Sequence, residues 1–359
     1  MEGKTVKLGV VGLCRGRFVI KSAFGGEGLD ITALCDIKEL PRQLATKLCE
    51  NAGYKVQCFD NYDDFLANAD IDAVFIATDA VCHVPYVIKA LEAGKHVLSE
   101  IPAINSVEEA RQLKAAVKAH PHLKYMNAEN CCYWTFIQSW KEMYQNGKLG
   151  EAVYAESEYI HSSDYRDFKP PKDPNHWRLW NPAIKYLTHN LGPLLYILDD
   201  KCVSVSCMRT DIMYNPYKKI PKTDVAIFKT AKGAVIKILI SFGAYHGFDH
   251  NFSIFGTRGT LETDITKPLE KAHTFARFAD VPGTLEEKME IPIRLKKPNE
   301  PGDDHGGADR KMLLDFIRCI IEDAPSPIDI DLAIDMALPG IIAAESAANG
   351  GQVMQIPEI

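Results

Sequence analysis

The first 125 residues alternate short apolar runs with amphipathic stretches. Apolar runs of strand length lie at residues 6–12, 30–37, 55–59, 72–78 and 95–100. Helical spacing of apolar residues separates several of these runs, and the stretch 84–94 stops at Gly94, a common helix C-terminal signal. Uniformly apolar strands that alternate with helices are typical of a parallel sheet covered on both faces. We therefore predict an N-terminal Rossmann domain, a doubly wound parallel sheet, over residues 1–125.

The pattern changes near residue 151, where strand-like segments follow one another with short turns. These segments are 151–161, 202–210, 224–230, 234–245, 250–264 and 287–295. One helical signal lies among them at about 185–198, and two helices, 309–323 and 331–351, close the chain. The pattern predicts an α+β domain over residues 126–359 with an open, mainly antiparallel sheet. Its last helices are expected to pack back on the first domain, so the fold class is α/β with two domains.

Composition narrows the function classes. The chain has 359 residues, 25% of them charged, with a net charge of −7 and no basic cluster, which argues against a nucleic-acid partner. No apolar run is long enough to span a membrane, so a cytoplasmic location is expected. The ten cysteines form no CxxC pair and are expected to be reduced, buried thiols, and no metal site is expected.

The first strand leads into "GLCRGR", residues 12–17, which resembles the dinucleotide fingerprint GxGxxG. Gly12 fits the first glycine, Cys14 replaces the second, and Gly16 comes one residue early. Such glycines let the backbone approach a pyrophosphate at a helix N-terminus. Arg15 or Arg17 is expected to add a phosphate contact.

Asp36 ends the second strand, where an acid would bind the adenosine ribose of NAD. The alternative is a plain strand–helix turn with a solvated Asp36. Thr78 and His83 follow the fourth strand at the carboxyl edge of the sheet and are candidates for the nicotinamide side. His83 is equally compatible with a helix N-terminal residue that contacts no ligand.

The fifth strand ends in Glu100-Ile101-Pro102. A carboxylate at this edge points to the same crevice and can hold the nicotinamide ribose, while Pro102 restricts Ile101 to an extended backbone.

At this point the chain resembles the Gfo/Idh/MocA oxidoreductases. The resemblance rests on "IDAVFIAT", "ALEAGKHVLSEIPA", "GTRGTLETD", "LLDFIRCIIED" and "AAESAANGGQVMQIP", in family order over nearly the full length. Members carry a lysine where this chain has Ile101, and that lysine contacts cofactor and substrate and helps to move a proton. Many members also carry an aspartate where this chain has Lys185, four residues before a catalytic histidine. The sequence departs from the ordinary dehydrogenase pattern at both positions.

One branch of the family also lacks the lysine and is similar to this chain in further places. These are "ENCCY" (129–133), "YIH" (159–161), "YxTHxLGP" (186–193) and "HGG" (305–307). The branch contains the NAD-dependent α-N-acetylgalactosaminidases, glycosidases that keep NAD bound. The resemblance implies a cycle in which a sugar is oxidised at C3, its C2 proton becomes acidic, the C1 substituent is eliminated, water adds, and the hydride returns.

Such a cycle needs an acid and a base near C2 and the leaving oxygen, roles that tyrosine or histidine can fill. The resemblance implies Tyr186 and His189 as the catalytic pair, which helical spacing would put on one face. Tyr159 and His161, on one face of a strand, join them as catalytic candidates. Glu129 is expected to help shape the sugar site and to contact the cofactor. Without the motif, each Tyr/His pair is equally explained as interior packing.

Four further residues are candidates for the substrate side: Lys185, Trp177, Arg178 and Tyr245. Trp177 is also compatible with a core position. The first functional hypothesis is therefore glycoside cleavage with recycled NAD. The alternatives are a net NAD-dependent dehydrogenase of a sugar or cyclitol, and a sensor that binds NAD or sugar without turnover. The family resemblance also implies a homo-dimer or homo-tetramer.

Overall fold

The computed structural model describes residues 4–162, 170–171, 173–266, 273–292 and 307–359. Its contacts divide the chain into two units: the first holds the residues up to Tyr133, those of 307–334 and Ile359, and the second holds the rest. The first unit thus runs past the expected boundary at residue 125 and includes one of the two closing helices. The first two residues of the "HGG" segment lie outside the described residues.

The first unit is built on a six-stranded sheet with the order β3-β2-β1-β4-β5-β6. Its strands are β1 Val6–Val11, β2 Leu29–Cys35, β3 Gln57–Phe59, β4 Ala73–Ile76, β5 His96–Ser99 and β6 Tyr125–Asn127. All neighbouring strands are parallel. The predicted doubly wound sheet is confirmed. Its order reverses between β1 and β4, which is where such sheets bind ligands.

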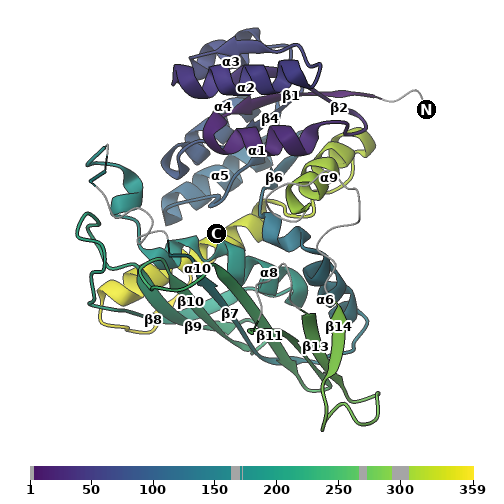
Figure 1. Cartoon of the computed structure of the whole chain (residues 1–359), viewed down its shortest axis with the longest axis vertical. Coiled ribbons are helices and arrows are strands. Elements are labelled where there is room, and N and C mark those ends of the chain that lie inside the picture. Colours follow the sequence, from purple (N-terminus) through teal and green to yellow (C-terminus); the bar gives the residue numbers. More distant parts are fainter. Residues whose placement is uncertain (1–3, 163–169, 172, 267–272, 293–306) are drawn as a thin grey trace. The chain divides into compact units, whose positions relative to one another are not determined.

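Helices cover both faces of this sheet. They are α1 Leu13–Ala23, α2 Glu39–Asn51, α3 Tyr62–Asn68, α4 His83–Glu92, α5 Val107–Ala119 and α9 Ala308–Glu322, with short 3-10 turns η1 Ala80–Cys82 and η2 Asn130–Tyr133. Helix α1 packs beside α2 and α9, and α4 packs beside α5 (Figure 1). At the start of α5, the Ser106 hydroxyl accepts the amide of Glu109 at 3.1 Å, as an N-cap residue does.

The second unit contains a nine-stranded sheet with the order β14-β13-β12-β11-β7-β10-β9-β8-β15. The strands are β7 Ala152–Ile160, β8 Cys202–Arg209, β9 Thr223–Thr230, β10 Val235–Ser241, β11 Asp249–Gly256, β12 Gly259–Thr263, β13 His273–Phe278, β14 Met289–Pro292 and β15 Met354–Gln355. Strands β7 and β10 pair in parallel, and every other described pair is antiparallel. The predicted open, mainly antiparallel sheet is confirmed.

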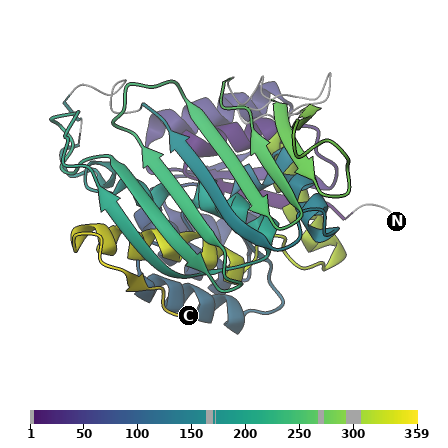
Figure 2. The same ribbon diagram turned by 90° about the horizontal axis from the view of Figure 1, so that it is seen from below.

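One face of this sheet is covered by helices. The helical elements are α6 Thr135–Gln145, η3 Trp177–Leu179, η4 Ala183–Tyr186, α8 Thr188–Leu198 and α10 Ile330–Ala348, whose first turn belongs to the first unit. The Asn190 amide on α8 donates to the Ser157 hydroxyl on β7 at 2.5 Å. The Cys207 amide on β8 donates to the Ser346 hydroxyl on α10 at 3.0 Å. Figure 2 shows the opposite, open face of the sheet.

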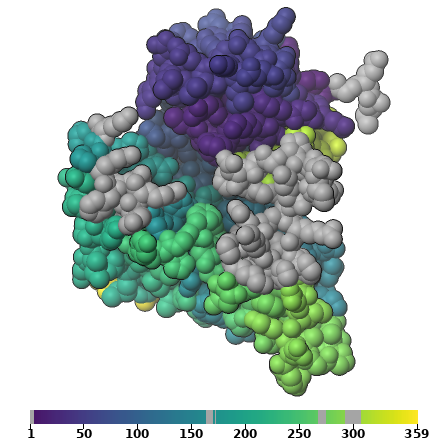
Figure 3. Space-filling model, viewed as in Figure 1, coloured from purple at the N-terminus to yellow at the C-terminus, as the bar shows by residue number. Residues whose placement is uncertain are grey.

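The surface of the second unit carries one projecting hairpin. Strands β13 and β14 and the turn between them stand out at the lower right of the space-filling view (Figure 3), and Leu285 in that turn is exposed. Among the helices of the described ranges, none is long and apolar enough to cross a membrane.

Candidate active site

The loop after β1 is shaped by Gly12. Its φ is 86°, in the region that favours glycine, and a Cβ there would lie 2.4 Å from the Ala77 carbonyl oxygen and 2.7 Å from the Thr78 nitrogen. Helix α1 begins at the next residue, and its first turn carries no acidic side chain. The positive end of this helix and the main-chain N–H groups of its first turn therefore suit an anion such as a pyrophosphate.

Cys14 and Gly16 occupy the rest of the fingerprint in different surroundings. The Cys14 side chain is exposed, so it leaves the loop backbone accessible. Gly16 is buried, and a Cβ there would lie 2.7 Å from a methyl of Val10 on β1. Gly16 thus allows the close helix–strand packing that the last glycine of the fingerprint provides, although it comes one residue early.

Asp36 follows β2 and binds two main-chain amides. One carboxylate oxygen accepts from the Leu13 amide at 2.8 Å and the other from the Lys38 amide at 2.8 Å. Each oxygen keeps lone-pair capacity for a second donor, such as a ribose hydroxyl. The loop of Gly12, the N-terminus of α1 and the Asp36 carboxylate together fit a dinucleotide cofactor.

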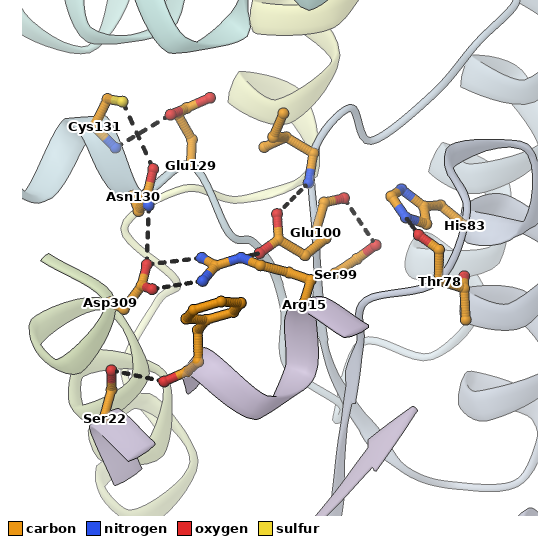
Figure 4. Close-up of polar contacts among 12 residues, drawn as sticks. Arg15, Ser22, Thr78, His83, Ser99, Glu100, Glu129, Asn130, Cys131 and Asp309 are labelled. Atoms are coloured by element: carbon orange, nitrogen blue, oxygen red, sulfur yellow. Dashed lines mark hydrogen bonds and ion pairs between the residues drawn. The ribbon is translucent and has the colours of Figure 1, made fainter. Parts of the chain in front are cut away.

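Arg15 points to two carboxylates (Figure 4). Its Nε donates to Glu100 at 2.7 Å, and its two terminal nitrogens donate to Asp309 on α9 at 2.7 and 2.8 Å. Burial opposes the charge of Arg15, but the two carboxylates outweigh it and raise the pKa of the guanidinium. The expected phosphate contact of Arg15 is untested, and the contacts described here tie its guanidinium to the protein.

Glu100 and its neighbours form the end of β5. Besides Arg15, the Glu100 carboxylate accepts from the Ile101 amide at 3.1 Å. The Ile101 side chain is buried, and so is Pro102. An apolar side chain therefore occupies the position where the family lysine would stand.

His83 lies under this edge with both ring nitrogens against main-chain carbonyls. Nδ1 is 2.9 Å from the Pro102 oxygen, and Nε2 is 3.1 Å from the Thr78 oxygen. The side chain is only 1% exposed. A ligand that makes a polar contact with His83 would have to displace one of these two carbonyls, so His83 is well placed to hold the loop of Thr78 and the segment of Pro102.

Glu129 and Asn130 lie just after β6. Glu129 is fully buried, and one of its carboxylate oxygens accepts from the Cys131 amide at 3.1 Å. The Asn130 side chain donates to Asp309 at 2.9 Å. Asn130 thereby joins the network of Arg15, Glu100 and Asp309.

In the second unit, Tyr159 is the centre of a group of rings. Its ring stacks on His250 with centroids 4.2 Å apart and planes 18° apart. The rings of His161, His189 and Tyr186 lie at 5.8, 5.9 and 6.1 Å from it. The structure therefore brings together all four residues predicted as catalytic.

Tyr186 and His189 contact each other from two different elements. Their ring centroids are 5.2 Å apart, but Tyr186 ends the 3-10 turn η4, whereas His189 lies in α8. The helix expected from residue 185 begins at Thr188. The reason lies in the hydrogen bonds of η4, where the Lys185 amide donates to the Pro182 carbonyl and the Leu187 amide to the Ile184 carbonyl, three residues back in each case.

Buried charges at the start of β9 hold this turn. The Asp224 carboxylate accepts from the Ile184 amide at 2.9 Å and from the Arg209 Nε at 2.6 Å. The Lys222 ammonium donates to the Asn181 carbonyl at 2.5 Å. Burial raises the pKa of Asp224, and the charge of Arg209 opposes that shift. The backbone position of Tyr186 is thus set by β9.

The predicted substrate residues are spread around the second unit. The Arg178 guanidinium lies 4.7 Å from the Trp177 ring centroid and 5.9 Å from that of Tyr186, so these three side chains adjoin. Lys185 precedes Tyr186 in η4. Tyr245 is 81% exposed in the loop after β10. The substrate roles of these residues remain predictions.

Three residues of these sites were missed by the sequence reasoning. His250 alternates with Phe252 and Ile254 along β11, and this period of two could have assigned it to the covered face. Asp224 and Asp309 gave no such signal, because their partners Ile184 and Arg15 are 40 and 294 residues away in the sequence.

Comparisons with known proteins agree with this geometry. Residues 6–128 match the model of the oxidoreductase family with an NAD-binding Rossmann fold (GFO_IDH_MocA), and residues 137–262 match the GFO/IDH/MocA C-terminal domain. A glycosyl hydrolase family 109 protein of Solibacter usitatus is 29% identical over 99% of this chain and 88% of its own length. An α-N-acetylgalactosaminidase of Bacteroides fragilis is 28% identical over 98% and 91%.

The fold is also that of a solved structure. Levoglucosan dehydrogenase, in complex with NADH and levoglucosan, superposes with a TM-score of 0.83 at 18% identity and covers 99% of this chain and 100% of that one. The two matching family models together cover more than half of the sequence. The chain belongs to the Gfo/Idh/MocA family of NAD-binding oxidoreductases.

Proposed function

We propose that the protein is an NAD-dependent enzyme that cleaves a glycoside through transient oxidation of the sugar at C3 and elimination across C1 and C2. The observation that carries the proposal is the pairing of a glycine loop and helix N-terminus that fit a dinucleotide with an apolar Ile101 at the lysine position and a separate Tyr/His cluster. The relatives named above, a family 109 glycosyl hydrolase and an α-N-acetylgalactosaminidase, support the same reading over nearly the full chain.

The first unit would hold NAD through Gly12, the amides at the start of α1, Asp36 and Glu100. When bound, NAD supplies a hydride acceptor and donor for C3 of the sugar. Asp36 lies after β2 and Glu100 after β5, on opposite sides of β1. The two acids would therefore bind different halves of the cofactor, Asp36 the adenosine ribose and Glu100 the nicotinamide ribose. Cys14, Thr78 and Glu129 are further candidates for contact.

Tyr186 and His189 would carry the proton transfers. Once C3 is a ketone, a base removes the C2 proton, the C1–O bond breaks, and the leaving oxygen takes a proton from the acid. Water then adds at C1, and C2 regains its proton. The two side chains face each other at 5.2 Å between ring centroids, so one can act as base while the other acts as acid. Tyr159 and His161 would orient the sugar.

The test is the release of an aryl group from aryl glycosides of several sugars, as both anomers, by the purified protein with its cofactor. We expect release without net formation of NADH, and exchange of the C2 hydrogen with deuterium from the solvent. Steady NADH production from a free polyol would contradict cleavage and identify a net dehydrogenase. Binding of NAD with neither reaction would indicate a sensor.

We also propose that two copies associate through the open face of the nine-stranded sheet. Met208, Val225 and Ile227 are exposed on it, and Leu239 pairs with Val225 in the neighbouring strand. Lys237 and Glu156 form an ion pair at 2.7 Å on the same face, so a copy related by a two-fold axis can offer opposite charges. Sedimentation of the wild type and Ile227→Asp would show a dimer and its loss.

We also propose a cytoplasmic location, which the ten free cysteine thiols support.

A further inference from the structure

Asp309 is a buried carboxylate on α9 that binds the side chains of Arg15 and Asn130. Its side chain is 0% exposed. It accepts two hydrogen bonds from the Arg15 guanidinium, at 2.7 and 2.8 Å, and one from the Asn130 amide at 2.9 Å. Figure 4 shows Asp309 on one side of Arg15 and Glu100 on the other. A bidentate contact of this kind fixes the plane of the guanidinium as well as its position.

We propose that Asp309 is a positioning residue of the NAD site, which acts through Arg15 to fix the carboxylate of Glu100. The guanidinium is rigid and planar. When Asp309 holds its two terminal nitrogens, the direction of Nε is set, and Nε is the atom that donates to Glu100 at 2.7 Å. Glu100 is one of the residues assigned above to NAD, so the inference rests on that assignment.

Helix docking alone does not account for this arrangement. Helix α9 is also tied to α1 by the next residue, Arg310, whose guanidinium donates to the carbonyls of Ser22 and Phe24 at 2.8 Å each and to that of Gly25 at 3.2 Å. These carbonyls lie at the C-terminal end of α1, away from the loop of Gly12. The contacts described for Asp309 go instead to Arg15 at the start of α1 and to Asn130 after β6.

The position of Glu100 in the sheet predicts which part of the cofactor should respond. Glu100 follows β5 on the nicotinamide side of β1, whereas Asp36 follows β2 on the adenosine side. Loss of the Asp309 carboxylate should therefore weaken the binding of whole NAD and leave the binding of AMP, which lacks the nicotinamide ribose, unchanged.

The experiment is calorimetric titration of nucleotide-free full-length protein with NAD and with AMP. For Asp309→Asn we expect NAD affinity to fall about tenfold, as a displaced charge-assisted hydrogen bond predicts, with AMP affinity equal to that of the wild type. Arg310→Gln is the matched control, because it loosens the same helix at the far end of α1. It should bind both nucleotides as the wild type does.

A second variant, Arg15→Lys, keeps the positive charge but lacks the planar guanidinium. Its single ammonium cannot bridge Asp309 and Glu100, so it should show the same selective loss of NAD affinity. The double variant should be no weaker than either single one, because both act on one contact chain.

Unchanged NAD affinity in a folded Asp309→Asn, or equal losses of NAD and AMP, would overturn the proposal. So would the same loss in Arg310→Gln, which would make the effect one of helix docking. If the wild type failed to bind NAD, the assignment of the cofactor site itself would be contradicted.

Discussion

The two sites are built by different means. In the first unit, charged side chains fix one another directly: Arg15 joins Glu100 and Asp309 through three hydrogen bonds of 2.7 to 2.8 Å. In the second unit, the candidate catalytic side chains are rings packed at centroid distances of 4.2 to 6.1 Å. The residues that hold them lie outside the ring group and bind the segments that carry the rings.

This difference shows where each site is sensitive to mutation. Asp224 on β9 and Asn190 on α8 bind the backbone of η4 and the strand β7, and thereby place Tyr186 and Tyr159 without belonging to the ring group. Substitutions in the first site should change cofactor affinity. Substitutions in the second should change turnover while the cofactor stays bound.

The largest effect is expected for His189→Ala. Removal of a positioned acid or base costs about 10²- to 10⁴-fold in rate, so glycoside cleavage should fall near the detection limit while NAD affinity stays that of the wild type. Steady-state rates and calorimetry on the same preparation measure both. His122→Ala, an exposed histidine of the first unit, serves as the control. Activity within tenfold of the wild type would remove His189 from the chemistry.

The next effect is expected for Gly12→Ala, which should break the first site alone. The added Cβ meets the Ala77 carbonyl oxygen at 2.4 Å, so the loop must move and NAD affinity should fall by about 100-fold. Gly94→Ala is the matched control, because its φ of 71° is also positive but nothing lies within 4 Å of the new Cβ. That variant should lose about 1 kcal/mol of stability and no NAD affinity. Equal NAD affinities in both variants would contradict the role of Gly12.

The smallest effect concerns Glu156 on the open face of the second sheet. Burial opposes its charge, but hydrogen bonds from Lys237 and Tyr154 lower the pKa of Glu156 below 4.5. Because the folded state then binds the proton less tightly than the unfolded state, the stabilisation is present above pH 4.5 and lost as the pH falls. The free energy of unfolding of the wild type should exceed that of Glu156→Gln by up to about 1 kcal/mol at pH 7, and the two free energies should converge at pH 3. Urea unfolding at both pH values measures the difference. A difference that persists at pH 3 would rule out the ion pair as its source.

Local patterns of apolar and polar residues predicted most of the fold. The apolar runs predicted β1, β2, β4 and β5 to within a few residues, because a strand buried on both faces needs a continuous apolar sequence. The cap of α5 obeys a local rule of the same kind, because Ser106 and Glu109 have the spacing of a capping box. Helix α3 and strand β6, only three residues long, were not predicted, since short elements carry little periodicity.

The candidate sites were predictable only in part. Tyr159 and His161 share a face of the sheet because strand residues two apart do so, and this needed no further information. The 3-10 turn before His189 depends on Asp224, which follows it by 40 residues, and the orientation of Arg15 depends on a residue 294 positions later. Such contacts arise from the tertiary fold and leave no periodic trace in the sequence.

The parallel pairing of β7 with β10 has a consequence for the order in which the chain matures. Strand β7 has as neighbours only β10 and β11, and both are synthesised at least 70 residues after it. On the ribosome, β7 therefore emerges before the two strands that flank it in the sheet. Until β10 and β11 follow, the backbone of β7 around Tyr159 stays unpaired. The first unit has a similar history, because α9, which carries Asp309, follows α1 by more than 280 residues. We expect neither unit to reach its native state until these later segments have left the exit tunnel, and fragments that stop at residue 133 to retain Arg15 without its carboxylate on α9.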